Sequence, residues 1–347
     1  MKKIAPQIKT GKRTSSTGLE GLWLEIGMDC DMKCSFCFNN AGGAVKEKDV
    51  MKTEDYISLL KQFKEMGGNT VGLPGAGEPF LASNWLITKI IIEYCDKNDI
   101  QCVIFTHGLH LTDEIIDFID KDNVSIALKY NSSSATVQDK IVGVEGYTEK
   151  RKAIIEKLKR KGFNKYIDNF SRLAFITPIF EENYDELPDL YRYCRDNQII
   201  PDIDTVLEKG RGTNFDIKKA EEKIKLMFEG LQKIDKEEYG YEWEISPTYV
   251  AGCCDRYKRH MYVNRFGVVS PCLGANLSGA HLGNLKEKSL EEMWSSSLMT
   301  KVKNKDYCGE CVNCQHFKEG TCHSCLGRFV DVLNEEKIHT IGCWHKK

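Results

Sequence analysis

Three closely spaced cysteines near the amino terminus constrain this 347-residue chain more than any other feature. Cys30, Cys34 and Cys37 stand in the run Cys-Asp-Met-Lys-Cys-Ser-Phe-Cys, and Phe36 immediately precedes the last of them. Three thiolates on one loop suit a cubane iron–sulfur cluster, which normally takes four cysteine ligands. One iron of such a cluster keeps an open site, at which a small molecule can bind.

The composition limits the classes of partner. Formal net charge is -2, from 49 Lys+Arg against 51 Asp+Glu, so bulk electrostatics give no support to a nucleic-acid partner. No stretch reaches the roughly 20 apolar residues of a membrane span, and the basic amino terminus lacks an apolar signal core. We therefore expect a cytoplasmic protein. Its 15 cysteines indicate metal or cluster ligation rather than disulfides, because that compartment is reducing.

Short apolar runs alternate with amphipathic segments from Gly21 to about residue 210. The predicted strands are 22–26, 69–73, 102–105, 124–128, 173–176 and 199–207. Helices are predicted between them, the first capped by Thr53. Repeated βα units imply parallel strands with right-handed crossovers, and six units are too few for a closed eight-stranded barrel. The predicted fold class is α/β, a partial (β/α)6 TIM-type barrel with its catalytic mouth at the strand C-termini.

The alternation of strands and helices ends after the sixth βα unit. A long helix is predicted over 216–236, and cysteines become dense after Tyr239. We therefore divide the chain into a basic tail (1–20), the barrel (21–215), a bridging helix (216–239) and a cysteine-rich C-terminal domain (240–347).

The cysteine run with its aromatic residue resembles the signature of the radical S-adenosylmethionine (SAM) superfamily. A second resemblance follows Leu73, where the chain has Pro-Gly-Ala-Gly-Glu-Pro over 74–79. Glycines such as Gly75 let the backbone approach a ligand closely. The family usually has Gly-Gly-Glu here, which holds the amino group of the methionine moiety. The motif is shifted in this chain, so the resemblance implies Gly77 and Glu78, together with Gly75 but not Ala76, as contacts. Without the cysteine loop, a plain strand-to-helix turn would be the better interpretation.

Two further strand ends resemble family segments at the same mouth. Thr106-His107-Gly108 is similar to a Thr-Asn-Gly turn, with His107 in place of Asn, although His107 is interpreted equally well as an ordinary loop histidine. The stretch from Ser125 to Lys129 and the turn over 142–146 resemble segments that line ribose and adenine. The resemblance therefore implies cofactor-lining roles for Phe36, Thr106, Ser125 and Lys129.

The C-terminal cysteines resemble the SPASM extension, which holds up to two auxiliary four-iron clusters. The resemblance implies an outer cluster on Cys311, Cys314, Cys322 and Cys343. It implies an inner cluster on Cys254, Cys272 and Cys325, completed by Cys308 or Cys253 or left with one iron open to substrate. The Cys314–Cys322 gap is longer, and the Cys322–Cys325 gap shorter, than the usual pattern. Paired cysteines of this kind also bind zinc, but the N-terminal motif favours iron–sulfur.

The resemblance implies an enzyme, a radical SAM oxidoreductase that takes an electron from a flavodoxin- or ferredoxin-like donor. It would cleave SAM to a 5′-deoxyadenosyl radical that abstracts hydrogen from a peptide or protein, causing oxidation, crosslinking or epimerisation. The alternative substrate is a small polar molecule, such as a sugar, aminocyclitol or nucleoside. A zinc protein or electron carrier that cleaves no SAM is the remaining hypothesis. Polar residues near the late strands can bind either substrate or be solvated charges: Arg172, Asp202, Asp204, Glu208 and Arg211.

Overall fold

The structure of the protein is a computed structural model. It describes residues 3–11, 17–42, 48–216, 219–245, 254, 256–320, 322, 324–327, 330–334 and 336–340. Two of the predicted cluster ligands, Cys253 and Cys343, lie outside the described residues.

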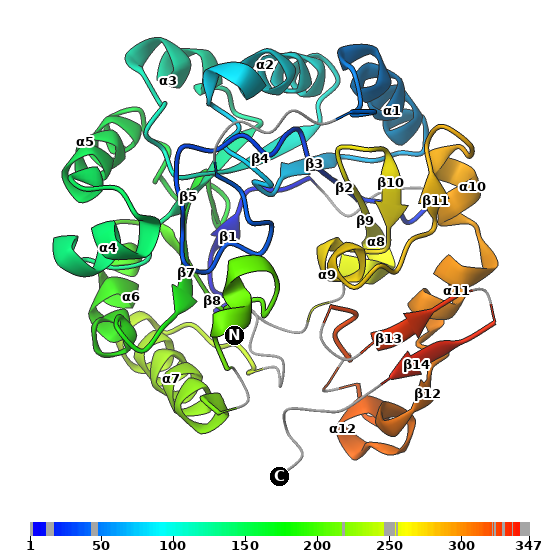
Figure 1. The fold of residues 1–347 in the computed structure, drawn as a ribbon. Helices are drawn as coiled ribbons and strands as arrows, with labels where there is room; N and C mark the ends of the chain where they lie inside the picture. The colour runs from blue at the N-terminus through cyan, green and yellow to red at the C-terminus, as the bar shows by residue number, and fades with distance from the viewer. Residues whose placement is uncertain are drawn as a thin grey trace.

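A nine-stranded sheet organises the molecule (Figure 1). Its strands are β2 (Gly21–Leu24), β3 (Thr70–Leu73), β4 (Gln101–Thr106), β5 (Val124–Lys129), β7 (Leu173–Ile179), β8 (Ile200–Thr205), β9 (His260–Val263), β10 (Val268–Ser270) and β11 (Gly283–Asn284). The spatial order is β11-β10-β9-β2-β3-β4-β5-β7-β8. Every pair from β9 to β8 is parallel, whereas β10 and β11 are antiparallel to their neighbours. The predicted α/β class and the partial barrel are confirmed.

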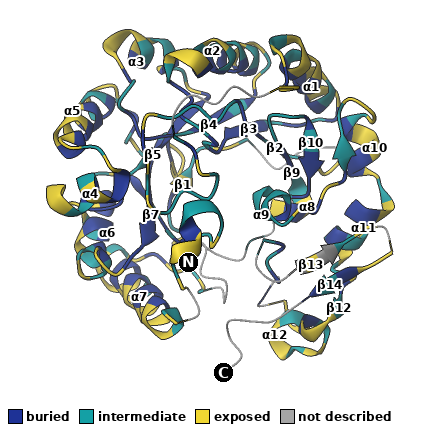
Figure 2. Cartoon of the chain, in the orientation of Figure 1, coloured by how far each residue is buried: buried dark blue, intermediate teal, exposed yellow. Residues whose placement is uncertain are grey.

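The connecting helices pack on the outer side of this sheet (Figure 1). They are α1 (Thr53–Glu65), α2 (Ala82–Lys97), α3 (Asp113–Ile119), α4 (Ala135–Val142), α5 (Tyr147–Arg160), α6 (Leu187–Asp196) and α7 (Glu221–Ile234). Their inward faces are buried and their outward faces exposed (Figure 2). In α1, the buried residues Tyr56, Leu59, Leu60 and Phe63 recur at the helical spacing that forms one apolar stripe.

Some local predictions differ from the structure. The N-cap of α1 is Lys52 rather than Thr53, because Thr53 already belongs to the first turn. The bridging helix α7 begins at Glu221 instead of Asp216 and continues into a π-helical turn over Asp235–Tyr239. Helix α4 was not anticipated from the sequence. Its N-cap Ser134 accepts a hydrogen bond from the backbone N–H of Val137.

The amino-terminal segment crosses the end of the barrel opposite the cysteine loop. Strand β1 (Gln7–Ile8) pairs in parallel with β6 (Phe170–Ser171), and Figure 1 shows β1 inside the ring of helices. The N–H of Gly11 donates to the hydroxyl of Thr70, at the start of β3. This segment therefore closes the barrel interior at the end opposite the cysteine loop, which is called the lower end below.

The first strands after residue 256 extend the barrel sheet, because β9 pairs in parallel with β2. The remaining chain adds a small sheet of order β12-β14-β13 and several short helices. Their bounds are α8 (Arg256–Arg259), α9 (Leu273–Leu277), α10 (Leu290–Trp294), α11 (Ser297–Asn304), α12 (Gln315–Lys318), β12 (Cys308–Gly309), β13 (Val330–Leu333) and β14 (Ile338–Thr340). Among the described residues, no helix combines the length and the apolar character needed to cross a membrane.

Candidate active site

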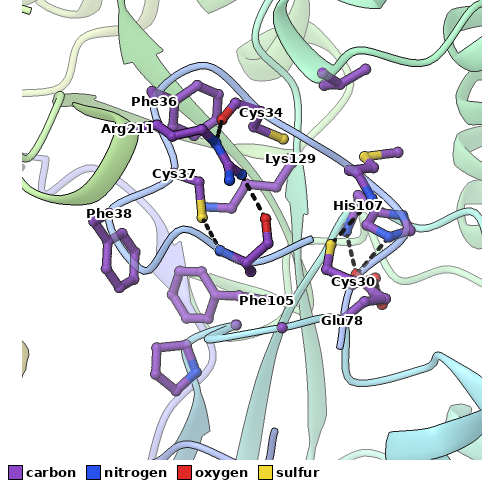
Figure 3. Close-up of a pocket in the computed structure, with 17 residues that line it drawn as sticks. Cys30, Cys34, Phe36, Cys37, Phe38, Glu78, Phe105, His107, Lys129 and Arg211 are labelled. Carbon is purple, nitrogen blue, oxygen red and sulfur yellow. Dashed lines mark hydrogen bonds and ion pairs between the residues drawn. The ribbon is translucent and has the colours of Figure 1, made fainter. Parts of the chain in front are cut away.

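The three-cysteine loop follows β2 and is braced by one arginine from the other end of the sheet (Figure 3). Arg211, which follows β8, donates from Nε to the carbonyl of Cys34 at 2.7 Å and from a terminal nitrogen to the carbonyl of Ala41 at 2.6 Å. Its backbone N–H donates to the carbonyl of Cys37 at 2.9 Å. Arg211 therefore fixes the loop, a structural task that differs from the substrate contact considered from the sequence.

The electrostatics of this loop favour a bound metal centre. Burial, followed by the charges of Cys30 and Cys37, raises the pKa of the Cys34 thiol to about 12. Three adjacent thiolates repel one another, and a cluster that binds them removes that penalty. Backbone N–H groups also point at sulfur: that of Met32 lies 3.5 Å from Sγ of Cys30, and that of Ala41 lies 3.3 Å from Sγ of Cys37. The residues present fit an iron–sulfur cluster.

The turn after β3 lies directly against the cysteine loop. A Cβ at Gly77 would stand 2.5 Å from the carbonyl oxygen of Asp29, so only glycine permits this approach. Gly75 has a φ of 75°, which is also favourable for glycine. The carboxylate of Glu78 is buried, and its Oε1 accepts a 2.5 Å hydrogen bond from the hydroxyl of Thr106. This hydrogen bond links Glu78 and Thr106, two of the predicted cofactor-binding residues.

A buried histidine connects this turn to the cysteine loop. Nε2 of His107 lies 2.9 Å from Asp31 and 3.3 Å from Glu78. The N–H of Leu109 donates to Nδ1 of the same ring at 3.2 Å. The hydrogen bond from His107 holds the pKa of Asp31 well below its usual range. Ligand atoms of Cys30, Asp31 and His107 lie within 4.8 Å of one another.

Most of these groups surround one cavity. It is lined by the three cysteines, by the turn over 74–78 and by Phe36, Thr106, His107, Lys129 and Arg211 (Figure 3). Lys129 extends from the end of β5 toward the cysteines, and burial lowers the pKa of its ammonium group. Ser125 is not brought here, because its hydroxyl donates to the carbonyl of Lys9 at the opposite end of β5.

A second and larger cavity of about 790 Å³ occupies the barrel interior. Phe105 lines both cavities, so they are adjacent. The larger cavity extends from residues 5–11 of the closing segment to Cys254, one of the predicted auxiliary ligands. Two of the predicted substrate residues, Asp202 and Asp204, line it from β8. Arg172 does not, because it is paired with Asp120 at 2.9 Å.

The inner set of C-terminal cysteines is drawn together in the structure. Cys272 is the N-cap of α9, where its sulfur accepts a bond from the N–H of Ala275. Burial, together with the nearby charges of Cys325 and Cys254, raises the pKa of the Cys272 thiol to about 12. These three thiols come from segments far apart in the sequence. Their mutual repulsion would be relieved by a shared cluster.

The other C-terminal cysteines lie around the three-stranded sheet. The sulfur of Cys311 accepts a hydrogen bond from Ser324, and the backbone N–H of Cys314 donates to the carbonyl of Cys311. Cys322 is buried. The thiol of Cys308 donates to the carbonyl of Ile338, between strands β12 and β14.

Tyr307 adds an observation that points to bound groups in this region. Its side chain is 7 % exposed, and its hydroxyl makes no hydrogen bond to any described residue. Burial, followed by the charges of Tyr257, Cys272, Cys325 and Cys311, raises its pKa well above the usual value. A buried hydroxyl normally has a partner, and the sulfurs of bound clusters would provide one. The donor set therefore fits auxiliary clusters.

Several important residues were missed by the sequence reasoning. Asp31, Arg256 and Tyr307 are single polar residues with no spacing pattern, and only the fold shows that they face thiols or a cavity. Asp31 and Tyr307 do adjoin cysteines in the sequence, which was the available signal. The expectation that Cys95, Cys102 and Cys194 are buried thiols agrees with the structure.

Comparison with known families gives two matches. Residues 24–194 match the model of the radical SAM superfamily, and residues 253–315 match that of SPASM, an iron–sulfur cluster-binding domain. No curated protein matches this chain at a significant level.

Solved structures with the same fold are remote in sequence. Streptococcus suis SuiB bound to S-adenosylmethionine is 17% identical, with a TM-score of 0.66 over 86% of this chain and 71% of that chain. SuiB bound to its precursor peptide SuiA is 16% identical, with a TM-score of 0.66 over 86% and 70%. Native anSMEcpe with bound AdoMet and Kp18Cys peptide is 17% identical, with a TM-score of 0.65 over 92% and 93%.

Proposed function

Because this chain belongs to the radical S-adenosylmethionine superfamily and carries a SPASM domain, we propose that it cleaves SAM reductively. The 5′-deoxyadenosyl radical would then abstract hydrogen from a substrate in the larger cavity. The observation that carries this proposal is the meeting of the three-cysteine loop with the turn over 74–78 around one cavity. A cluster bound to Cys30, Cys34 and Cys37 supplies the electron for the cleavage.

The residues around the smaller cavity have distinct tasks in this proposal. Arg211 keeps the cysteine loop in place through two carbonyls. Glu78 receives the ammonium group of the methionine moiety, because its buried carboxylate offers a negative charge at the edge of the cavity. Thr106 and His107 orient that carboxylate by donating to its two oxygens. Lys129 provides a positive charge on the opposite wall.

We propose a peptide or protein as the substrate, with oxidation, crosslinking or epimerisation of a side chain as the outcome. Support comes from two proteins of the same fold, SuiB and anSMEcpe, whose structures contain bound peptides. In this proposal the enzyme is an oxidoreductase. Auxiliary clusters on the C-terminal cysteines would accept the second electron or orient the substrate, and a flavodoxin- or ferredoxin-like protein would be the donor.

A small polar molecule is the second candidate substrate, and one observation favours it. The larger cavity is lined at its lower end by the chain's own residues 5–11 and carries charged side chains within. A cavity of about 790 Å³ matches the size range of small-molecule sites. A sugar, aminocyclitol or nucleoside would fit such a space whole, whereas a peptide would insert one side chain.

The test compares the parent with a variant in which Cys30, Cys34 and Cys37 are alanine. Both are purified without oxygen and reconstituted, their iron and sulfide are counted, and 5′-deoxyadenosine is assayed after reduction with SAM. Three cubane clusters predict about twelve irons in the parent and about eight in the variant. 5′-Deoxyadenosine should come only from the parent. Zinc in place of iron, with no 5′-deoxyadenosine, would overturn the proposal.

A further inference from the structure

Two charged side chains that line the larger cavity have no hydrogen-bonding or ion-pair partner among the described residues. Asp202 and Arg256 both line it, and neither makes a hydrogen bond or an ion pair with a described residue. Other arginines that line the same cavity are paired: Arg195 with Asp235 and Arg259 with Glu20, each at 2.7 Å. The two unpaired groups therefore stand out against a cavity wall whose other ion pairs are satisfied.

These two groups come from different parts of the sheet. Asp202 lies on β8, the last strand of the barrel, opposite Ile176 in the neighbouring strand. Arg256 begins α8, which leads into β9 beyond the other end of the barrel, and its guanidinium lies 5.2 Å from the ring centre of Trp23. Each side chain acts electrostatically on the other, but no ion pair joins them. Their charged atoms are therefore too far apart for a direct ion pair, although both side chains line the same cavity.

Charges of both signs surround the pair, among them the thiol of Cys254, which acts on Arg256. Lys129 and Asp204 also act on this region, and they contribute one charge of each sign. Part of the cavity wall is apolar and is formed by Val103, Ala127 and Ala174. The cavity thus combines charged side chains of both signs with apolar side chains.

Charge complementarity selects the group that fits between Asp202 and Arg256. Asp202 is half-buried and Arg256 is exposed, and a ligand group that completes the hydrogen bonds of both side chains gains charge-assisted bonds. An ammonium group is attracted by Asp202 but repelled by Arg256. A carboxylate is attracted by Arg256 but repelled by Asp202. A neutral hydroxyl or primary carboxamide both donates and accepts, so it satisfies the two residues together.

We propose that Asp202 and Arg256 form a substrate-binding pair that recognises a neutral hydroxyl or carboxamide group, with the ring of Trp23 packed against the adjoining carbon skeleton. This inference rests on the proposed function, because it assigns the cavity to the substrate of the radical reaction. The recognised group can belong to a polyhydroxylated small molecule or to a serine, threonine, asparagine or glutamine side chain of a peptide.

The experiment measures binding without turnover. Cyclohexanol, cyclohexylamine and cyclohexanecarboxylate share one skeleton and differ in charge. Each is titrated into the anaerobic holoenzyme, and binding is followed by saturation-transfer NMR. We expect cyclohexanol to bind about tenfold or more tightly than either charged probe, the difference expected when a charge is misplaced.

Two variants make the test specific. In Asp202→Asn the remaining guanidinium should turn the preference toward the carboxylate. In Arg256→Gln the remaining carboxylate should turn it toward the amine. This opposite switch would not arise from general damage to the fold. Asp185→Asn, at an exposed position, is the matched control and should leave the order of the three probes unchanged.

A second comparison separates the two sources of the group. N-acetylserinamide represents a peptide side chain, and myo-inositol represents a polyhydroxylated ring. If either probe binds the parent but neither variant, the result supports recognition by Asp202 and Arg256. An identical probe order in the parent and both variants would overturn the inference, as would absence of binding in the parent. Iron content and 5′-deoxyadenosine formation are measured in parallel, so failure of the radical function itself would be recognised separately.

Discussion

The hydroxyl of Thr106 donates a 2.5 Å hydrogen bond to Oε1 of Glu78, although 28 residues separate them in the chain. The bond joins the end of β4 to the turn after β3, because neighbouring parallel strands end at the same edge of the sheet. The second carboxylate oxygen accepts the backbone N–H of His107 at 3.0 Å. Glu78 is therefore held in one orientation before any ligand arrives, which reduces the entropy that binding would cost.

Replacing Glu78 by glutamine should weaken SAM binding while leaving the fold intact. The amide has the same shape, but it removes the negative charge that, in the proposed function, receives the ligand's ammonium group. Loss of a charged hydrogen bond costs about 1.5–3 kcal/mol, which corresponds to roughly 10- to 150-fold in affinity. Equilibrium binding of SAM to the reconstituted protein measures this. Glu93→Gln, on the exposed side of α2, is the control, and equal affinities in the two variants would contradict the assigned role.

Replacing Gly77 by alanine should disrupt the contact between the turn and the cysteine loop. The added Cβ would lie 2.5 Å from the carbonyl oxygen of Asp29, so the backbone must move. Overpacking of this kind costs about 1–3 kcal/mol. Gly230→Ala in α7 is the matched control, because no atom lies within 4 Å of its added Cβ. It should stabilise the protein by about 0.5–1 kcal/mol. Urea unfolding of both variants measures the difference, and similar midpoints would refute this account of Gly77.

Replacing Arg211 by lysine should loosen the cysteine loop although the charge is kept. A lysine ammonium cannot reproduce the two bonds that the guanidinium makes to the carbonyls of Cys34 and Ala41. We expect the N-terminal cluster to be lost several-fold faster in the presence of a chelator. Iron content and the electron paramagnetic resonance signal follow that loss. Arg160→Lys, at an exposed position of α5, should behave as the parent; a loss rate in the Arg211 variant equal to this control would show that the brace is dispensable.

The barrel and the meeting of the cysteine loop with the turn over 74–78 could be predicted because their signals are local. Apolar runs in the sequence mark the six strands. The turn after Leu73 and the turn at Thr106 follow neighbouring parallel strands, so the sheet brings these two turns together. Arg211 was noticed only as a charge near a late strand. Its contacts with the cysteine loop join residues 177 positions apart, and no pattern in the sequence records such a pairing.

Ser125 shows the limit of assigning a site by strand alone. The side chains of Ser125 and Lys129 share one face of β5, four residues apart, but they lie at opposite ends of the strand. The hydroxyl of Ser125 meets the closing amino-terminal segment, whereas Lys129 reaches the cysteines. The sequence indicated the correct strand, but it did not indicate that residues 3–11 turn back across the lower end of the barrel. That packing depends on long-range contacts such as the pairing of β1 with β6.

Replacing Asp235 by asparagine should destabilise the protein, because Asp235 is the centre of a buried polar cluster. It accepts two bonds from Arg195, at 2.8 and 2.7 Å, and one from the hydroxyl of Tyr191. The amide would leave the buried guanidinium without a counter-charge, at a cost of about 3–5 kcal/mol. Urea unfolding measures the change. Asp189→Asn is the control, because Asp189 pairs with an exposed arginine; its effect should stay within about 0.5 kcal/mol, and equal losses in the two variants would contradict the prediction.

Replacing Tyr307 by phenylalanine should lower the reduction potential of an auxiliary cluster. The buried hydroxyl has no partner among the described residues, and the thiols of Cys272, Cys325 and Cys311 act on it electrostatically. A hydrogen bond donated to a cluster sulfur stabilises the reduced, more negative state, so its loss makes reduction harder. At a fixed solution potential, a tenfold fall in the ratio of reduced to oxidised cluster corresponds to a shift of about 59 mV. A redox titration followed by electron paramagnetic resonance measures this shift.

The iron count separates two roles for that hydroxyl. An unchanged count with a lower potential in the Tyr307 variant identifies a hydrogen-bond donor, because the cluster stays bound while its electronics change. A loss of iron would instead identify a ligand or a packing requirement and would contradict the donor role. Tyr94→Phe, on α2 and distant from the C-terminal cysteines, should change neither quantity. Since phenylalanine preserves the ring contact with Phe317, whose centre lies 5.7 Å away, the potential reports on the hydroxyl alone.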